Sequence, residues 1–234
     1  MKKFKLTLGL SAILSFICFN SDALEIFEAT MQRFSFTTEH FMYESYKMEP
    51  LFKELFNNKM IQFENFEKKI DISESKDTAP NLNPVEIGID KYKVVFPGKK
   101  ELYEFVGKKL PASPNYAFYG GFERSLTESI INYTAKSADE KLYSIFMRKN
   151  TSGSADETLP QMYSILRKNP AAFLKTFKNM SDEEKNLCVN AQYDFNLSVE
   201  ENSFSKDTVA KLSKDLQKTA EQFNKMIQGR VSPH

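Results

Sequence analysis

Helix-start signals recur through the second half of the chain, and they constrain its fold more than any other feature. In three places a Ser is followed three residues later by a Glu, the pattern of a capping box in which each side chain bonds a backbone N–H at the helix start. The pairs are Ser137 with Glu140, Ser154 with Glu157, and Ser181 with Glu184. Asn169 followed by Pro170 is a further start signal, because Asn caps well and Pro fits the first helical turn. These signals predict short helices that begin near residues 137, 156, 170 and 182.

Apolar spacing predicts a pair of helices over residues 24–72. The residues separated by three, four and seven positions are Phe27, Met31, Phe34 and Phe41. This spacing places them on one face of a helix over about 24–48. Pro50 then suits the first turn of a second helix, whose apolar stripe continues to Ile70. The pair is expected to form either a hairpin or a single kinked rod.

Residues 73–98 are expected to form a linker with a short β element. Residues 73–84 are polar, contain two Pro and lack periodicity, which is typical of a loop. The segment that follows alternates apolar and polar residues, as a half-buried strand does. Its alternating apolar residues are Val85, Ile87, Ile89, Tyr92, Val94 and Phe96. Asp90 and Lys91 form the tight turn of a hairpin, or else the whole run is one strand.

The remaining residues, 99–234, are expected to form a helical domain that packs with the N-terminal pair as one unit. Its last helix is predicted to be long, because Ser205 can cap its start and Gly229 can end it. We therefore predict a mainly α fold, a bundle or array of short helices with a small β-hairpin or strand near residues 85–96.

Two segments within this domain, residues 137–150 and 154–169, resemble each other. Both contain Ser-Ala-Asp-Glu, Tyr-Ser-Ile and Arg-Lys-Asn. Either duplication or the sequence preferences that short helices share explain the likeness, since acidic residues at the start and basic residues at the end suit the helix dipole. Pro160 has no counterpart in the first copy, so the second helix is predicted to begin later, near Thr158. The region is shorter than an α-solenoid, whose repeats span roughly 33 to 47 residues. The likeness therefore predicts two similar short helices and gives no indication of a substrate.

The first 23 residues have the pattern of a secretory signal peptide. A basic start is followed by an apolar run over residues 6–19, and small residues precede a cut after Ala23. An uncleaved N-terminal anchor is the alternative. Cleavage removes three Lys and one Asp from 32 basic and 31 acidic residues, so the charges stay almost balanced and predict no nucleic-acid partner. No second long apolar run follows, so we expect a periplasmic or secreted protein without a stable membrane span.

The sequence offers little for metal or cofactor chemistry. Cleavage would leave Cys188 as the one cysteine, so the 21 Phe and 10 Tyr residues must hold the core without a disulfide. Cys188 is expected to be a buried apolar residue, with a reactive thiol or a dimer seam as alternatives. His40 and His234 make no metal-binding spacing with other ligands. With eight Gly and no phosphate-loop pattern, we predict no cofactor, no metal and no catalytic residue.

The segment Asn115–Arg124 is the candidate binding site. It groups aromatic residues around two glycines and an arginine, as surfaces that recognise proteins do. The candidate partner-binding residues are Tyr116, Phe118, Tyr119, Gly120, Gly121, Phe122 and Arg124. The alternative is that these rings fill the core between helices while the glycines make the turn.

Three functions are compatible with these observations. The first is an exported, non-enzymatic binding protein, such as a periplasmic partner, inhibitor or immunity-type protein. The second is a helical carrier of lipid or another apolar ligand, suggested by the Phe-rich segments. The third is a cell-wall hydrolase that uses two carboxylates, for which Glu123 and Glu128 are the candidates.

Overall fold

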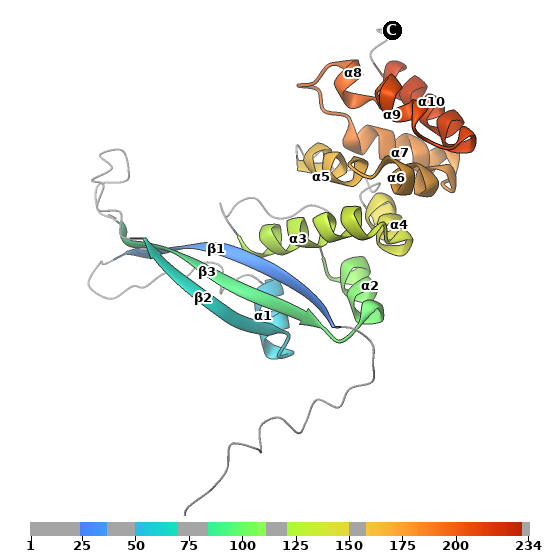
Figure 1. Cartoon of the computed structure of the whole chain (residues 1–234). Coiled ribbons are helices and arrows are strands. Elements are labelled where there is room, and N and C mark those ends of the chain that lie inside the picture. Colours follow the sequence, from blue (N-terminus) through green and yellow to red (C-terminus); the bar gives the residue numbers. More distant parts are fainter. Residues whose placement is uncertain (1–23, 37–49, 70–83, 111–120, 150–157, 231–234) are drawn as a thin grey trace, which may run out of the picture.

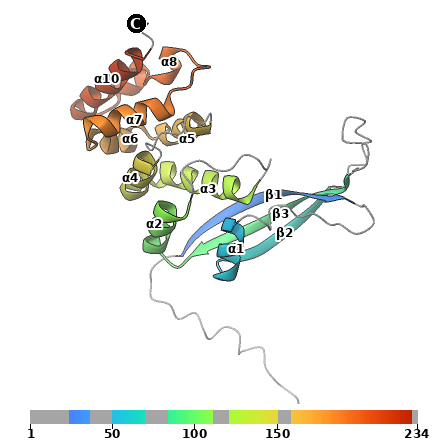
Figure 2. The same ribbon diagram turned by 180° about the vertical axis from the view of Figure 1, so that it is seen from behind.

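The computed structural model describes residues 24–36, 50–69, 84–110, 121–149 and 158–230. It has a mainly α fold with a small antiparallel sheet of three strands, as the sequence predicts. The strands are β1 (Glu25–Phe36), β2 (Ile61–Lys69) and β3 (Pro84–Phe96), in the order β1-β3-β2. Figures 1 and 2 show the sheet as a long curved ribbon that extends away from the helices.

The prediction of a helix over residues 24–48 is wrong, because its first half is strand β1. Phe27 and Ala29 are buried on one face of this strand, while Ile26 and Glu28 are exposed on the other. That is the period of two expected of a half-buried strand. Pairing with β3 along the whole strand, with Phe27 opposite Val94, overrides the helical spacing of the apolar residues. Residues 37–49, where the predicted helix would end, lie outside the described residues.

The second predicted helix is correct at its start and wrong at its end. Pro50 is the first residue of α1 (Pro50–Asn57), as predicted. Lys59 then takes a left-handed conformation with φ 56°, which ends the helix and turns the chain into β2. The described residues within 24–72 therefore form a strand, a helix and a strand in place of a helical pair.

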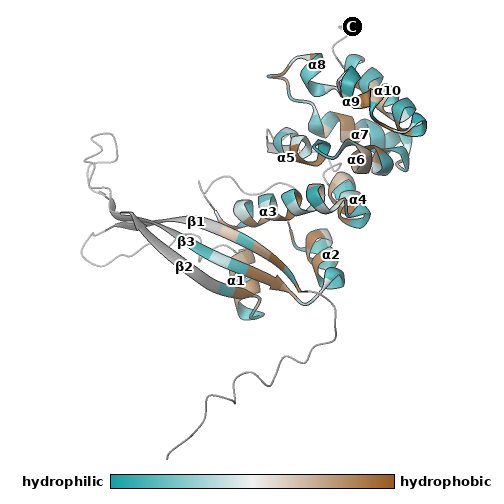
Figure 3. Ribbon diagram, viewed as in Figure 1, coloured by the Kyte–Doolittle hydropathy of each residue, from teal (hydrophilic) through white to brown (hydrophobic). Residues whose placement is uncertain are grey.

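The predicted β element is a single strand. Asp90 and Lys91 continue the pairing of β3 with both neighbours, so the alternative of a hairpin turn at these residues is wrong. The inner face of β3 buries Tyr92, Val94 and Phe96. Figure 3 shows hydrophobic residues of β1 and β3 at the end of the sheet nearest α2.

The helices that follow pack mainly with every second neighbour. They are α2 (Lys99–Lys108), α3 (Phe122–Ser137), α4 (Glu140–Lys149), α5 (Thr158–Arg167), α6 (Pro170–Lys178), α7 (Asp182–Gln192), α8 (Val199–Asn202), α9 (Lys206–Ala210) and α10 (Lys214–Gln228). Helices α2, α4, α6 and α10 form one row, and α3, α5 and α7 form the other. Figure 1 shows this array rising from the sheet, with α3 packed on β1. This alternation lets each helix bury its apolar face against its neighbours, as the repeats of solenoid proteins do.

Two of the predicted helix starts are confirmed. At α7, Ser181 and Glu184 form the complete capping box. The Glu184 N–H donates to the Ser181 hydroxyl at 3.1 Å, and the Ser181 N–H donates to the Glu184 carboxylate at 2.8 Å. At α6, the Asn169 side chain accepts from the Ala172 N–H at 3.3 Å, and Pro170 follows as the first helical residue.

The predicted boundary near residue 137 is confirmed, but its predicted cap is wrong. Ser137 ends α3, and Asp139 caps α4, which begins at Glu140, by accepting from the N–H groups of Lys141 and Leu142. The long last helix is broken: Ser205 caps the short α9, and α10 starts only at Lys214. The box at residues 154–157 lies outside the described residues, whereas α5 does begin at Thr158 as predicted.

The two similar segments form helices that exchange hydrogen bonds. The Tyr143 hydroxyl of α4 donates to the Leu166 carbonyl of α5 at 2.9 Å, and the Tyr163 hydroxyl of α5 donates to the Met147 carbonyl of α4 at 3.3 Å. Aligned on their Arg-Lys-Asn ends, Met147 and Leu166 occupy equivalent positions. The likeness therefore serves packing, as predicted.

Residues at the ends of these two segments also make similar hydrogen bonds. Lys149 at the end of α4 donates to carbonyls at the end of α2, including Val106 at 2.8 Å. Asn169 after α5 donates to the Ala135 carbonyl near the end of α3 at 3.2 Å. Each end therefore donates to carbonyls in the last turn of the helix two places earlier, which lack a partner within that helix.

Candidate functional site

The structure places the predicted aromatic segment partly in the core. Tyr116, Phe118, Tyr119 and Gly120 lie outside the described residues, and Gly121 is the residue before α3. The Phe122 side chain is fully buried. Its ring lies edge-on to Phe52, with 5.1 Å between centroids, and also contacts Tyr92. For Phe122 the alternative of core packing is confirmed.

The remaining predicted residues of this region lie on one helix. Arg124 forms an ion pair with Glu128 one turn later on α3, at 3.0 Å between nitrogen and oxygen. Glu123 and Glu128 are five positions apart, which separates their side chains by about 140° around the helix axis. The two carboxylates therefore point to different sides of α3, and they do not converge on a substrate as the pair in a glycosidase does.

Cys188 is a buried free thiol, as the sequence predicts for a small apolar residue. Its side chain lies near Tyr163 and Arg167, and the Gln192 amide donates to its sulfur at 3.9 Å. Burial raises the pKa of the Cys188 thiol from 9.0 to about 12. The alternatives of a reactive thiol and of a dimer seam do not fit this position, because the sulfur is protonated and out of reach of solvent.

We expect Cys188 to resist alkylation in the folded protein and to react fully after unfolding in guanidinium. The unfolded thiol ionises near its ordinary pKa of 9.0, whereas the folded thiol stays neutral to about pH 12. The unfolded state therefore loses its proton first, so stability should fall as the pH rises above about 9. Mass spectrometry after a short pulse of iodoacetamide checks this, and complete labelling of the native protein would contradict it.

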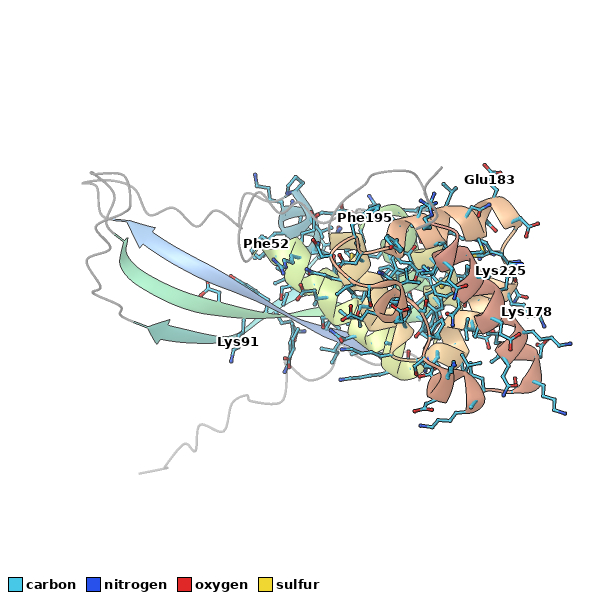
Figure 4. The ribbon with its side chains drawn as sticks, turned by 90° about the horizontal axis from the view of Figure 1, so that it is seen from above. Phe52, Lys91, Lys178, Glu183, Phe195 and Lys225 are labelled. Atoms are coloured by element: carbon cyan, nitrogen blue, oxygen red, sulfur yellow. The ribbon has the colours of Figure 1, made fainter. Side chains whose placement is uncertain are left out.

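A more exposed aromatic residue lies elsewhere, between α7 and α8. We call residues 193–198 the Phe195 loop. Phe195 is 86% exposed, and Leu197 beside it is 39% exposed. Tyr193 is buried at the base of the loop, with its ring edge-on to Phe195 at 5.1 Å between centroids. Figure 1 shows the loop projecting from the helical array near α8, and Figure 4 shows Phe195 on its surface.

The buried side chain of Asn202 fixes the backbone of this loop. Its amide nitrogen lies 2.9, 3.3 and 3.0 Å from the carbonyl oxygens of Asp194, Leu197 and Ser198, and its oxygen accepts from the Asp194 N–H at 2.9 Å. The Asn202 side chain is itself fully buried. The loop is therefore held in one conformation although Phe195 makes little contact with the rest of the protein.

Further bonds connect the loop to the helical array. The Asp194 carboxylate accepts from the Asn196 N–H at 2.8 Å, which tightens the turn that carries Phe195. Ser198 and Glu201 form a capping box at the start of α8. The Arg167 guanidinium at the end of α5 donates to the Asn202 carbonyl, so the second of the two similar segments supports the base of the loop.

An open groove lies next to this support. Its volume is about 410 Å³, and it runs between the end of α5 and the α8–α9 region. The charged side chains that line it are Arg167, Lys168 and Glu201. Because Glu201 also caps α8, the groove adjoins the start of the helix that follows the loop.

Sequence reasoning missed the Phe195 loop. Two signals were present: the Ser198 and Glu201 capping box, and the aromatic residues on either side of Asp194. They mark a turn followed by a helix, but exposure of Phe195 depends on how Asn202 is buried, which no local pattern shows.

The described residues contain no group of three or more His, Cys, Asp or Glu side chains suited to a metal ion. Among the same residues, we find no helix that has both the length and the apolar character needed to span a membrane. Comparisons with protein families, with curated proteins and with solved structures found no match to this chain.

Proposed function

We propose that the chain is an exported, non-enzymatic binding protein that contacts a partner protein through the Phe195 loop. The observation that carries this proposal is an aromatic side chain, 86% exposed, on a loop fixed by a buried amide. Aromatic residues dominate binding energy at interfaces. A loop already held in one conformation loses little entropy when it binds. These two features together favour recognition over catalysis.

Export to the periplasm or medium is the second element of the proposal. It rests on the signal-peptide pattern of residues 1–23. Strand β1 begins at Glu25, two residues after the predicted cut, so cleavage would leave the described fold intact. Sequencing the N-terminus of the protein from the periplasmic fraction tests this element, and Leu24 is the expected first residue.

The carrier and hydrolase alternatives find less support. The Phe residues that suggest a carrier pack on one another, as Phe173, Phe177 and Phe223 do with centroids 5.4 to 6.3 Å apart. The two candidate carboxylates of the hydrolase do not converge. The aromatic residues Tyr116, Phe118 and Tyr119 stay a prediction for a further part of the contact surface.

Site-specific photo-crosslinking in the native cells tests the proposed contact. With benzoylphenylalanine at position 195, we expect a discrete crosslinked species, because this side chain would lie at the centre of the interface. The same group at Lys225, which is exposed on α10, is the control and should give none of that species. Equal crosslinking at both positions, or none at position 195, would count against the proposal.

A further inference from the structure

We infer that the partner segment bound by the Phe195 loop is cationic: a protein segment that presents an apolar side chain or pocket for Phe195, flanked by Lys or Arg. This inference rests on the proposed function and adds the chemistry of the partner. It follows from the carboxylates that lie close along the chain to the exposed apolar residues of the loop.

The segment that carries the loop is acidic over an unusual length. The twenty residues 186–205 contain no Lys or Arg, in a chain with 32 of them. They contain three carboxylates, Asp194, Glu200 and Glu201, all within six positions of Phe195. A partner whose apolar group meets Phe195 therefore meets negative charge on the chain segments next to it.

Two of these carboxylates are held in place by hydrogen bonds to the backbone of the loop. Asp194 accepts from the Asn196 N–H, and Glu201 accepts from the Ser198 N–H at 2.9 Å. Hydrogen bonding to Ser198 lowers the pKa of Glu201, so its charge persists in mildly acidic conditions. Glu200 is exposed in the first turn of α8. Hydrogen bonds therefore hold two of the three carboxylates, and Glu200 adds a third negative charge at the surface.

Complementary charge mainly sets which partner docks and how fast. Carboxylates beside the ring disfavour an anionic lipid surface, which attracts basic segments and repels acidic ones. They disfavour nucleic acid for the same reason. The groove also contains two basic side chains, Arg167 at the end of α5 and Lys168 after it, and Arg167 is already bonded to the Asn202 carbonyl.

A pair of synthetic peptides tests the inference on the purified full chain. Each peptide carries one Trp with two Leu, flanked in one peptide by Lys and in the other by Glu. The chain itself contains no Trp, so Trp fluorescence reports the peptide alone. We expect the Lys peptide to bind at least about tenfold more tightly than the Glu peptide, with affinity that falls as salt is added.

Two charge reversals provide a matched comparison. Glu200→Lys lies beside the loop, whereas Glu183→Lys lies in the first turn of α7, near the other end of that helix, about 14 Å along its axis from the loop. Both change the net charge equally and at equivalent helix positions. We expect Glu200→Lys to weaken binding of the Lys peptide by about fivefold, and Glu183→Lys to weaken it by less than about twofold.

The outcomes separate the inference from the proposed function. If the Glu peptide binds as tightly, or the two reversals act equally, the cationic partner is excluded while the loop can still be a contact site. If Phe195→Ala leaves binding of both peptides unchanged, the Phe195 loop is excluded as the binding site. Binding to vesicles of phosphatidylglycerol that is lost in Phe195→Ala would show a membrane in place of a protein, and would overturn the inference.

Discussion

Phe122→Ala is expected to lower the free energy of unfolding by about 3–5 kcal/mol, the range for removal of a buried Phe ring. The Phe122 side chain is fully buried where α1, β3 and α3 meet, edge-on to Phe52 and Tyr92. Truncation leaves a cavity lined by rings that cannot collapse without moving a helix or a strand. Guanidinium unfolding, monitored by circular dichroism, measures the change in the free energy of unfolding. It is obtained from the shift in the midpoint concentration of denaturant when the slope of the free energy against denaturant stays constant.

Phe195→Ala is the matched control, because it removes the same ring from a position that is 86% exposed. Its effect on the free energy of unfolding should stay within about 0.5 kcal/mol. Because a loss of 3–5 kcal/mol can unfold a domain of ordinary stability, Phe122→Leu provides a milder variant, with an expected loss of about 1–2 kcal/mol. Equal effects of the two alanine variants would contradict the core position of Phe122 and return it to the candidates for binding.

The comparison of these two rings shows what the sequence could predict. Phe122 begins a helix and Phe195 lies between two helices, and the paired glycines before Phe122 favoured its segment as the predicted binding site. Their burial is opposite because Phe122 packs on rings of β3 and α1, which are distant along the chain, whereas Phe195 lies on a surface loop and packs only on Tyr193 among the described rings. Exposure of a single ring is decided by tertiary packing, which local patterns do not contain.

Helices with complete caps could be predicted, and long-range strand pairing could not. The Ser181 box and the Asn169 cap depend on neighbours within three residues, so the sequence states them directly. Strand β1 pairs with β3 far along the chain, with Phe27 opposite Val94, 67 positions later. The apolar spacing in β1 is compatible with either a helix or a strand, and only this pairing decides between them.

Asn202→Ala is expected to lower the free energy of unfolding by about 2–4 kcal/mol. The side chain is fully buried and bonds both the N–H and the C=O of Asp194, together with the carbonyls of Leu197 and Ser198. Each buried polar group left without a partner costs about 1–3 kcal/mol, reduced where water can replace the lost bond. Asn196→Ala, an exposed side chain in the same loop, is the control and should change stability by less than about 0.5 kcal/mol.

Asn202→Ala should also weaken binding at Phe195, although the buried Asn202 side chain cannot contact a partner. Without it the Phe195 loop samples many conformations, and binding must then supply the entropy that ordering the loop costs. Hydrogen exchange of the Asp194 and Leu197 amides should become faster, since both are bonded within the loop in the native protein. A variant that exchanges faster and binds the Lys peptide more weakly, while Asn196→Ala does neither, would show that recognition depends on the fixed loop. Faster exchange with unchanged affinity would show that the rigidity of the loop serves stability alone.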